Sequence, residues 1–438
     1  MAALRVGLAA VVLADLAARA ADLGVFYTDA GVLPRAALRD PEATLPPLSV
    51  HLAAGSAAGV AALFVLAALA AIALGAGVAP RLAALLSWLF AISLQHRNPT
   101  LLSGGDQLLA LLLLWCAFAP LGRGGARPLR SAGTAAIVIQ VGAVHLCAGL
   151  FKLLESPAWR DGTALALALQ DVSVSRWGAA LRAHPDLTRA LTWAVLGLEI
   201  LGPLILLSPI RSGPLRAASV LSLIALHLGV ALCLQVGIFP FVSAVALLAL
   251  TPAWLWDRLR VPAPREAPAD PGGPARWQEA LCATLLALVI WANVGGLWAR
   301  ARPPAPIASA LAWAGLAQEW SMYVDLREPS GWFRITGARL DGSEVRLLLE
   351  GAPPDDARRY QNLRWHAYMG ALARREGLRR LLAEHLCRRG EGAPLRRVEI
   401  RFDCQHFCGA QNDAPPPPPR ELIPCPDAPP EAPDAGPR

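Results

Sequence analysis

The feature that most constrains this chain is a series of long apolar runs separated by polar connections. A run of about 17 to 25 mostly apolar residues is long enough to cross a bilayer as a helix. By this criterion the sequence predicts helices at 4–24, 57–78, 80–95, 105–121, 132–154, 188–209, 215–237, 239–256 and 278–299. Because 55% of the residues are hydrophobic and 17% are charged, we expect an all-α polytopic membrane bundle of about nine transmembrane helices.

The composition changes after Arg302 to that of a small soluble domain. We therefore divide the chain into a transmembrane domain (1–300), a small α+β domain (301–410) and a Pro-rich tail (411–438). In the α+β domain, alternating residues at 332–349 around an Asp-Gly turn predict a hairpin. An amphipathic helix is expected at 359–388 and another strand at 395–402, whereas the tail is expected to be disordered apart from what Cys425 holds. The segment 262–274, rich in proline and charge, predicts a linker.

Arginine is unequally distributed between the connections on the two sides of the predicted bundle. One side receives Arg5, Arg81, Arg123, Arg127, Arg130, Arg211, Arg216, Arg258, Arg260, Arg265 and Arg276. The connections on the other side are longer and mix arginine with acidic residues. Cytoplasmic loops are enriched in Lys and Arg, so the first side, with the N-terminus, is predicted to be cytoplasmic. An odd number of spans then places the C-terminal domain outside the cytoplasmic (inner) membrane.

The cysteines of the C-terminal part give an independent indication of its location. Cys387, Cys404, Cys408 and Cys425 form an even set in polar sequence. They lack the paired spacing of structural zinc ligands, so no metal site is predicted. Disulfides persist outside the cytosol, which agrees with an extracytoplasmic domain. The pairing remains open.

The positive charge of the chain comes almost entirely from arginine. Lys152 is the only lysine among 40 Lys and Arg residues. No basic run interleaved with aromatic residues is present, so a nucleic-acid partner is not expected, and membrane lipids are. A guanidinium stays charged, whereas a lysine amine in a partly desolvated pocket can be neutral and act as a base. The alternative is that Lys152 extends from a helix end to the membrane interface.

Several other polar groups interrupt the apolar runs. Asp15, Arg19 and Asp22 share one face of the first helix and are expected to pair with each other, which also argues against a signal peptide. Between the third and fourth helices lies the turn HRNP, which contains His96, Arg97 and Asn98 and precedes SGGD, where Asp106 can cap the next helix.

Three further ionisable groups lie within apolar runs. His145 lies two helical turns before Lys152, so both can line one cavity. Glu199 and His227 are isolated in their predicted helices, where a polar group usually has a partner, and a neutral core role for His227 fits as well as chemistry. The helix at 132–154 ends on the outer side, which places Lys152 at the level of the HRNP turn, where it can meet Asn98. One or two short interfacial helices are expected at 155–186.

Taken in order, these pieces resemble the HTTM domain shared with the vitamin K-dependent gamma-carboxylases, in a bacterial form. The resemblance covers nearly all of the membrane region and is carried by FYTDAGVLPR (26–35), QHRNPTLLSGGD (95–106), AGLFKL (148–153) with Trp159, HLGVAL (227–232), GIFPF (237–241) and QEWSMY (318–323). In that family a lysine at the position of Lys152 is the proposed base that deprotonates reduced vitamin K. The region after the bundle lacks the large lumenal part by which animal carboxylases hold protein substrates.

The resemblance implies a site and two alternative functions. In the first, the protein is a carboxylase-like or oxygenase-type membrane enzyme for a reduced quinone-like cofactor, in which Lys152, Asn98 and His96 are catalytic. Its cofactor-binding residues would be Arg97, His145, Trp159, Glu199 and His227. In the second, the bundle is a non-catalytic module that binds a lipid or a protein partner. A protein substrate, if one exists, is not identified by the sequence.

Overall fold

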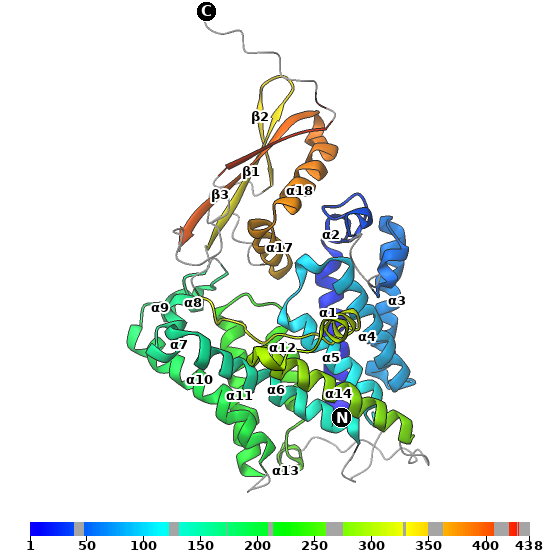
Figure 1. The fold of residues 1–438 in the computed structure, drawn as a ribbon, viewed down its shortest axis with the longest axis vertical. Helices are drawn as coiled ribbons and strands as arrows, with labels where there is room; N and C mark the ends of the chain where they lie inside the picture. Colours follow the sequence, from blue (N-terminus) through cyan, green and yellow to red (C-terminus); the bar gives the residue numbers. More distant parts are fainter. Residues whose placement is uncertain are drawn as a thin grey trace, which may run out of the picture.

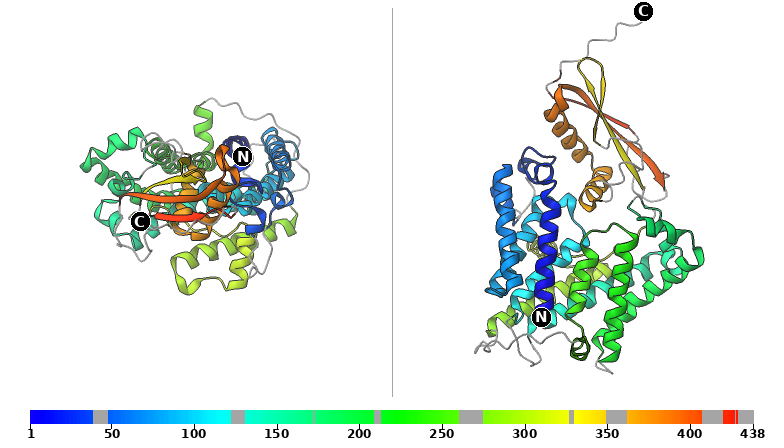
Figure 2. Two further views of the ribbon diagram at one scale, coloured as in Figure 1. Left: turned by 90° about the horizontal axis from the view of Figure 1, so that it is seen from above. Right: turned by 180° about the vertical axis from the view of Figure 1, so that it is seen from behind.

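The computed structural model describes residues 1–38, 48–121, 131–171, 173–208, 213–259, 275–326, 330–348, 362–406, 420–426 and 428. A bundle of helices carries a four-stranded antiparallel sheet and two helices stacked on one end. Figure 1 shows that Met1 and the sheet lie at opposite ends of the molecule, and the right view in Figure 2 agrees.

Each segment that was expected to be a membrane helix contains a helix. Their bounds are α1 (Ala2–Ala20), α3 (Ala57–Ala76), α4 (Pro80–Arg97), α5 (Gly104–Phe118), α6 (Ala132–Glu155), α10 (Pro185–Leu207), α11 (Pro214–Cys233), α12 (Phe239–Leu248) and α14 (Arg276–Leu297). Among the described residues, 5 helices are long and apolar enough to cross a membrane, namely α3, α6, α10, α11 and α14. The α5 and α12 helices are apolar but shorter, so the larger number of spans stays a prediction.

The segment 239–256 is not one helix. The α12 helix ends at Leu248, and a separate helix, α13 (Ala253–Arg258), starts after Pro252. Proline has no N–H to donate and clashes with the preceding helical turn, so it separates the two. A second proline, Pro203, lies inside α10 without ending it.

Shorter helices fill the connections. They are α2 (Leu23–Tyr27), η1 (Arg35–Leu38), η2 (Val50–Ala53), η3 (Pro99–Leu101), α7 (Pro157–Asp161), α8 (Ala164–Ala168), α9 (Arg176–Arg182), η4 (Ala299–Ala301) and α15 (Ala305–Trp313). The connection from α6 to α10 therefore contains three short helices, α7 to α9, where one or two were expected. The predicted linker at 262–274 lies outside the described residues.

Capping side chains mark the first turns of two helices of the bundle. Ser103 and Asp106 form a capping box at the start of α5, which confirms the expected capping by Asp106. Ser131 and Thr134 form another at the start of α6.

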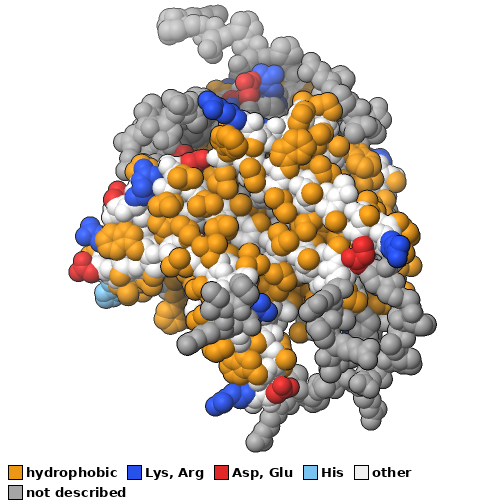
Figure 3. Space-filling model, turned by 60° about the horizontal axis from the view of Figure 1, so that its bottom comes forward, with side chains coloured by type: hydrophobic (Ala, Val, Ile, Leu, Met, Phe, Trp, Pro, Cys, Tyr) orange, Lys and Arg blue, Asp and Glu red, His pale blue; other side chains and the backbone are white. Residues whose placement is uncertain are grey.

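The long helices expose large aliphatic side chains, such as Val65 on α3 and Leu232 on α11, each 59% exposed. Figure 3 shows a face covered largely by hydrophobic side chains, with charged ones mostly near its edges, as a membrane-facing surface requires.

The C-terminal sheet has the order β2-β1-β3-β4. The expected hairpin is confirmed as β1 (Ser330–Arg339) and β2 (Glu344–Leu348), and the expected strand as β3 (Leu395–His406). Gly342 adopts a φ of 86° in the hairpin turn, which favours glycine. A fourth strand, β4 (Arg420–Pro424), lies within the segment that was expected to be disordered and pairs with β3.

The helix expected at 359–388 is two helices, α17 (Leu363–Arg374) and α18 (Glu376–Arg389), followed by η5 (Gly390–Gly392). Arg375 between them has an extended backbone, with φ −128° and ψ 107°. A disulfide between Cys387 and Cys425 joins α18 to the end of β4 with a Cα–Cα distance of 5.6 Å. It confirms one pair of the predicted set, while Cys408 lies outside the described residues. The larger of two hydrophobic clusters continues from the bundle into this domain.

Candidate functional site

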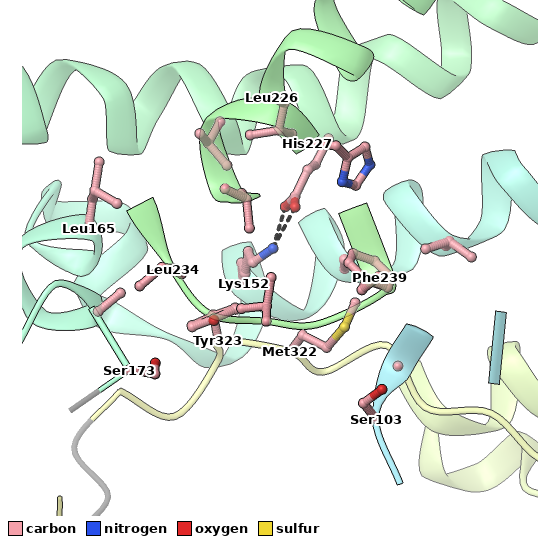
Figure 4. A pocket seen from close by; sticks show the side chains of 18 of the residues that line it. Ser103, Lys152, Leu165, Ser173, Leu226, His227, Leu234, Phe239, Met322 and Tyr323 are labelled. Carbon is pink, nitrogen blue, oxygen red and sulfur yellow. Dashed lines mark hydrogen bonds and ion pairs between the residues drawn. The ribbon is translucent and has the colours of Figure 1, made fainter. Parts of the chain in front are cut away.

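A largely apolar cavity of about 260 Å³ lies where the bundle meets the C-terminal domain. Its walls come from α6, α8, α10, α11 and the start of α12, and its polar lining includes Lys152, Glu199, His145 and His227. Figure 4 shows Lys152 near the centre of this arrangement. The sequence prediction that His145 and Lys152 line one cavity is confirmed.

Lys152 forms a buried ion pair with Glu199. The Lys152 Nζ atom lies 2.6 Å from each carboxylate oxygen of Glu199, and the two side chains are 5% and 12% exposed. Gly149 makes this approach possible, because a Cβ at this position would lie 3.1 Å from Glu199 Cβ and 2.8 Å from Ile200 Cγ1. The glycine precedes Lys152 by one helical turn on the same face of α6, so the pair depends on close packing of α6 against α10.

Trp159 connects the ion pair to the chain that follows the bundle. Lys152 Nζ lies 5.0 Å from the centre of the Trp159 ring, within the range of a cation–π contact. The indole Nε1 donates a hydrogen bond of 2.7 Å to the carbonyl of Tyr323. Tyr323 has a φ of 61°, a left-handed conformation that is uncommon for a non-glycine residue. Trp159 therefore fixes both the amine and a strained segment that borders the cavity.

His145 and His227 form a second polar contact in the same cavity. Their Nε2 atoms lie 2.9 Å apart, and His145 Nδ1 lies 2.8 Å from the carbonyl of Val141. A carbonyl only accepts, so Nδ1 of His145 carries the proton and its Nε2 accepts from Nε2–H of His227 when both rings are neutral. The hydrogen bond between the two rings joins α6 to α11 and occupies one ring nitrogen of His227.

The C-terminal part of the chain closes the cavity. Met322 and Tyr323, in the segment between α15 and β1, line it together with Leu363 and His366 of α17. Figure 4 shows Met322 and Tyr323 on the opposite side of Lys152 from Leu226. The sequence offered no pattern for Leu363 and His366, which come from a helix expected to belong to a separate domain.

A second buried ionic centre lies beside the cavity, between α1, α5 and α17. Asp15 and Asp106 are bridged by two guanidiniums. Arg19 donates to Asp15 at 2.6 Å and to Asp106 at 2.5 Å, while Arg364 donates to Asp15 at 2.6 Å and to Asp106 at 2.5 Å. Arg19 also donates to the Tyr27 hydroxyl at 2.6 Å. The predicted pairing of Asp15 with Arg19 is confirmed.

Asp22 does not belong to this centre. Its carboxylate accepts a long hydrogen bond of 3.4 Å from Asn362, at the start of α17. The helix α1 ends at Ala20, so Asp22 no longer follows the helical spacing that would place it beside Arg19. The expected three-residue pairing is wrong in this respect, because the second carboxylate beside Arg19 is that of Asp106.

The HRNP turn does not contribute to the cavity. His96 Nδ1 lies 3.0 Å from the carbonyl of Leu48, and Arg97 donates to the carbonyl of Leu33 at 2.9 Å. Asn98 donates to the carbonyl of Phe26 at 3.0 Å and accepts from Thr100. These contacts hold the segment after α1 against the end of α4, and none of the three residues lines the cavity. The expected meeting of Asn98 with Lys152 is therefore not observed, although the following Ser103 and Gly104 do border the cavity.

No protein-family model, curated protein or solved structure matches this chain.

Proposed function

We propose that this protein is an HTTM-type integral membrane enzyme that binds a lipid-soluble cofactor, a reduced quinone of the vitamin K kind, in the cavity beside Lys152. The observation that carries the proposal is the position of the only lysine in the chain. Lys152 is 4% exposed, lies on the wall of an apolar cavity and has one acidic partner, Glu199, among the described residues. A chain that uses arginine at all other cationic positions keeps an ionisable amine here.

The chemistry supported by this pair is proton abstraction from a hydroxyl group. In apolar surroundings a proton can move from the ammonium of Lys152 to the carboxylate of Glu199, because the neutral pair avoids two buried charges. A neutral Lys152 amine would be able to accept a proton from a hydroxyl group of a bound ligand. The resulting ammonium, held 2.6 Å from Glu199, would stabilise negative charge beside it.

The other cavity residues take supporting roles in this proposal. Trp159 orients the Lys152 amine through its ring, and the His145–His227 pair offers a polar contact for the cofactor. In this proposal the HRNP residues His96, Arg97 and Asn98 hold the segment after α1 in place and do not contact the reacting atoms.

Substitution of Lys152 by arginine tests the base directly. The variant keeps the charge and can still pair with Glu199, yet it cannot give up a proton at accessible pH. We expect normal expression and thermal stability, and no complementation of a deletion strain. The variant Arg216→Lys serves as a matched control that should complement fully. Full complementation by Lys152→Arg would exclude Lys152 as a base.

A lipid mass spectrum of the purified wild-type protein should contain a quinone-sized molecule.

The bidentate geometry of the ion pair also favours a second candidate, the non-catalytic lipid-binding or partner-binding module. Because both carboxylate oxygens of Glu199 already accept from Lys152, the pair can simply hold α6 and α10 together. In that case Lys152→Arg should complement, and the same lipid should co-purify with both proteins. The two functions thus give opposite outcomes in one experiment.

We further propose that the N-terminus is cytoplasmic and that the C-terminal domain lies outside the inner membrane. Support comes from the arginine distribution, from the position of Met1 at the end opposite the sheet and from the Cys387–Cys425 disulfide. After reduction of intact cells, a thiol reagent that cannot cross membranes should label Cys387 and Cys425. Labelling that needs permeabilised cells would reverse the topology.

A further inference from the structure

We infer that the C-terminal domain forms part of the ligand-binding site, with α17 as its roof, Arg364 as the residue that positions this roof and His366 as a residue that contacts the ligand. The inference rests on the proposed cavity function. It assigns to the C-terminal domain a direct role in ligand binding in addition to any recognition outside the membrane.

The start of α17 is fixed to the bundle at three successive residues. Asn362 donates to Asp22 at 3.4 Å and also caps α17 by accepting from Arg364 N. Leu363 packs against Gly237, where a Cβ would lie 2.1 Å from Leu363 Cδ2. Gly237 also has a φ of 66°, so the bundle side of this contact requires glycine.

Arg364 supplies the strongest of these contacts. It is 5% exposed and donates to Asp15, to Asp106 and, at 2.8 Å, to the carbonyl of Leu101. Without it, two buried carboxylates would share Arg19 alone, which leaves one negative charge without a matching positive one. Because Leu363 and His366 lie within one helical turn of Arg364, the ionic contact sets their position over the cavity.

His366 is a cavity-lining residue of α17 with unused hydrogen-bonding capacity. Its Nδ1 atom is buried and has no hydrogen-bond partner among the described residues. A buried polar nitrogen usually has a partner. A hydroxyl or carbonyl group of the ligand would provide one here, at a point distinct from the Lys152–Glu199 pair. The ligand class is therefore an apolar molecule with a polar group directed toward the C-terminal domain.

The position of the roof can be tested without any ligand. Ala168 lines the cavity, and the Ala168→Cys variant of the full chain can be labelled with methyl methanethiosulfonate and followed by mass spectrometry of the peptide. We expect Arg364→Met to speed this labelling at least about tenfold, since loss of a buried ionic contact shifts an opening equilibrium by more than that. Arg379→Met is the matched control, because Arg379 is similarly buried but pairs with Glu421 within the C-terminal domain. Equal labelling in Arg364→Met and its parent, or equal acceleration by Arg379→Met, would overturn the inference.

A second variant covers the case in which Arg364→Met does not fold. Gly237→Ala displaces Leu363 and leaves all buried charges in place, so it should also speed labelling. Its control is Gly342→Ala, which has a similarly positive φ of 86° but no neighbouring atom within 4 Å. If both glycine variants leave the labelling rate unchanged, α17 does not close the cavity.

The contact with His366 needs a ligand, and we name menadione as the probe. His366→Leu should weaken menadione binding about tenfold, whereas His385→Leu, a histidine of α18 that does not line the cavity, should not. Unchanged affinity in His366→Leu removes this residue from the site. If the wild-type protein binds no menadione, the proposed cofactor class fails, while the labelling experiment still decides the position of the roof.

Discussion

The two buried ionic centres of this protein differ in the cation that each uses. The centre between α1, α5 and α17 contains two arginines and two aspartates in mutual contact. The centre in the cavity contains the only lysine and one glutamate. Guanidinium holds its proton at all accessible pH and forms several directed hydrogen bonds at once, which suits a permanent connection between three helices. An amine that can lose its proton suits a site where protons move.

The largest effect is expected for charge reversal in the arginine centre. Arg19→Glu would place a third carboxylate beside Asp15 and Asp106, with Arg364 as the only cation. Disruption of a buried ion pair typically costs about 3 to 5 kcal/mol. We expect a loss of folded yield in fluorescence-detected size-exclusion chromatography that exceeds any change in ligand binding. Normal yield and thermal stability of Arg19→Glu would show that this centre does not hold the fold.

A smaller loss of stability is expected in the cavity centre. Glu199→Gln leaves the Lys152 ammonium without its carboxylate, but the amine borders a cavity where water can enter or the proton can leave. We therefore expect a cost of about 1 to 3 kcal/mol, measured as a lower melting temperature in detergent, together with loss of complementation. A stability loss as large as that of Arg19→Glu would mean that both centres serve the same structural purpose.

Asp22 provides a test of the boundary of the arginine centre. Because the carboxylate of Asp22 makes only a 3.4 Å hydrogen bond with the amide of Asn362 among the described residues, Asp22→Asn should change stability by less than about 0.5 kcal/mol. Asp15→Asn is the matched comparison and should destabilise the protein strongly. If the two variants behave alike, Asp22 interacts with the arginines in solution.

The smallest effect concerns the pH dependence of the contact between α18 and the bundle. His385 Nδ1 lies 2.8 Å from the carbonyl of Ala30, and burial lowers the pKa of His385 below its ordinary value of 6.5. The folded state thus binds fewer protons than the unfolded state below about pH 6.5, so this contribution to stability is present above that pH and is lost as the pH falls. The decrease in melting temperature from pH 7.5 to pH 5.5 should be smaller in His385→Gln. An unchanged decrease would exclude His385 as a contributor.

Local sequence signals predicted the helices of the bundle and three of the four strands of the sheet, β1, β2 and β3. Apolar runs, the capping residue Asp106 of α5 and the Asp-Gly turn of the hairpin all act within a few residues along the chain. The break at Arg375 was not predicted, because the nearest glycine, Gly377, lies two residues beyond it, inside α18. It is imposed by the docking of α17 on the bundle and of α18 on the sheet.

The site was predicted only in part for a related reason. Helical spacing placed His145 and Lys152 in one cavity, and isolation in apolar sequence pointed to Glu199 and His227. Which partner each group takes depends on contacts between distant segments. Arg364 was one arginine among many in a basic helix, and only the fold shows that it meets Asp15, 349 residues earlier in the chain. The HRNP turn was misplaced because the sequence predicts the level of the turn along the bundle but not the direction in which its side chains point.

The arginine centre also has a consequence for biosynthesis. Asp15 and Arg19 leave the ribosome early and can pair at once, and Asp106 adds a second carboxylate soon afterwards. Arg364 follows Asp106 by 258 residues, which at about 5 to 20 residues per second is a delay of about 13 to 52 s. Throughout this interval the nascent bundle carries one uncompensated acidic group. A chain that terminates before α17 keeps this defect permanently, so the last ionic contact to form distinguishes a finished molecule from a truncated one.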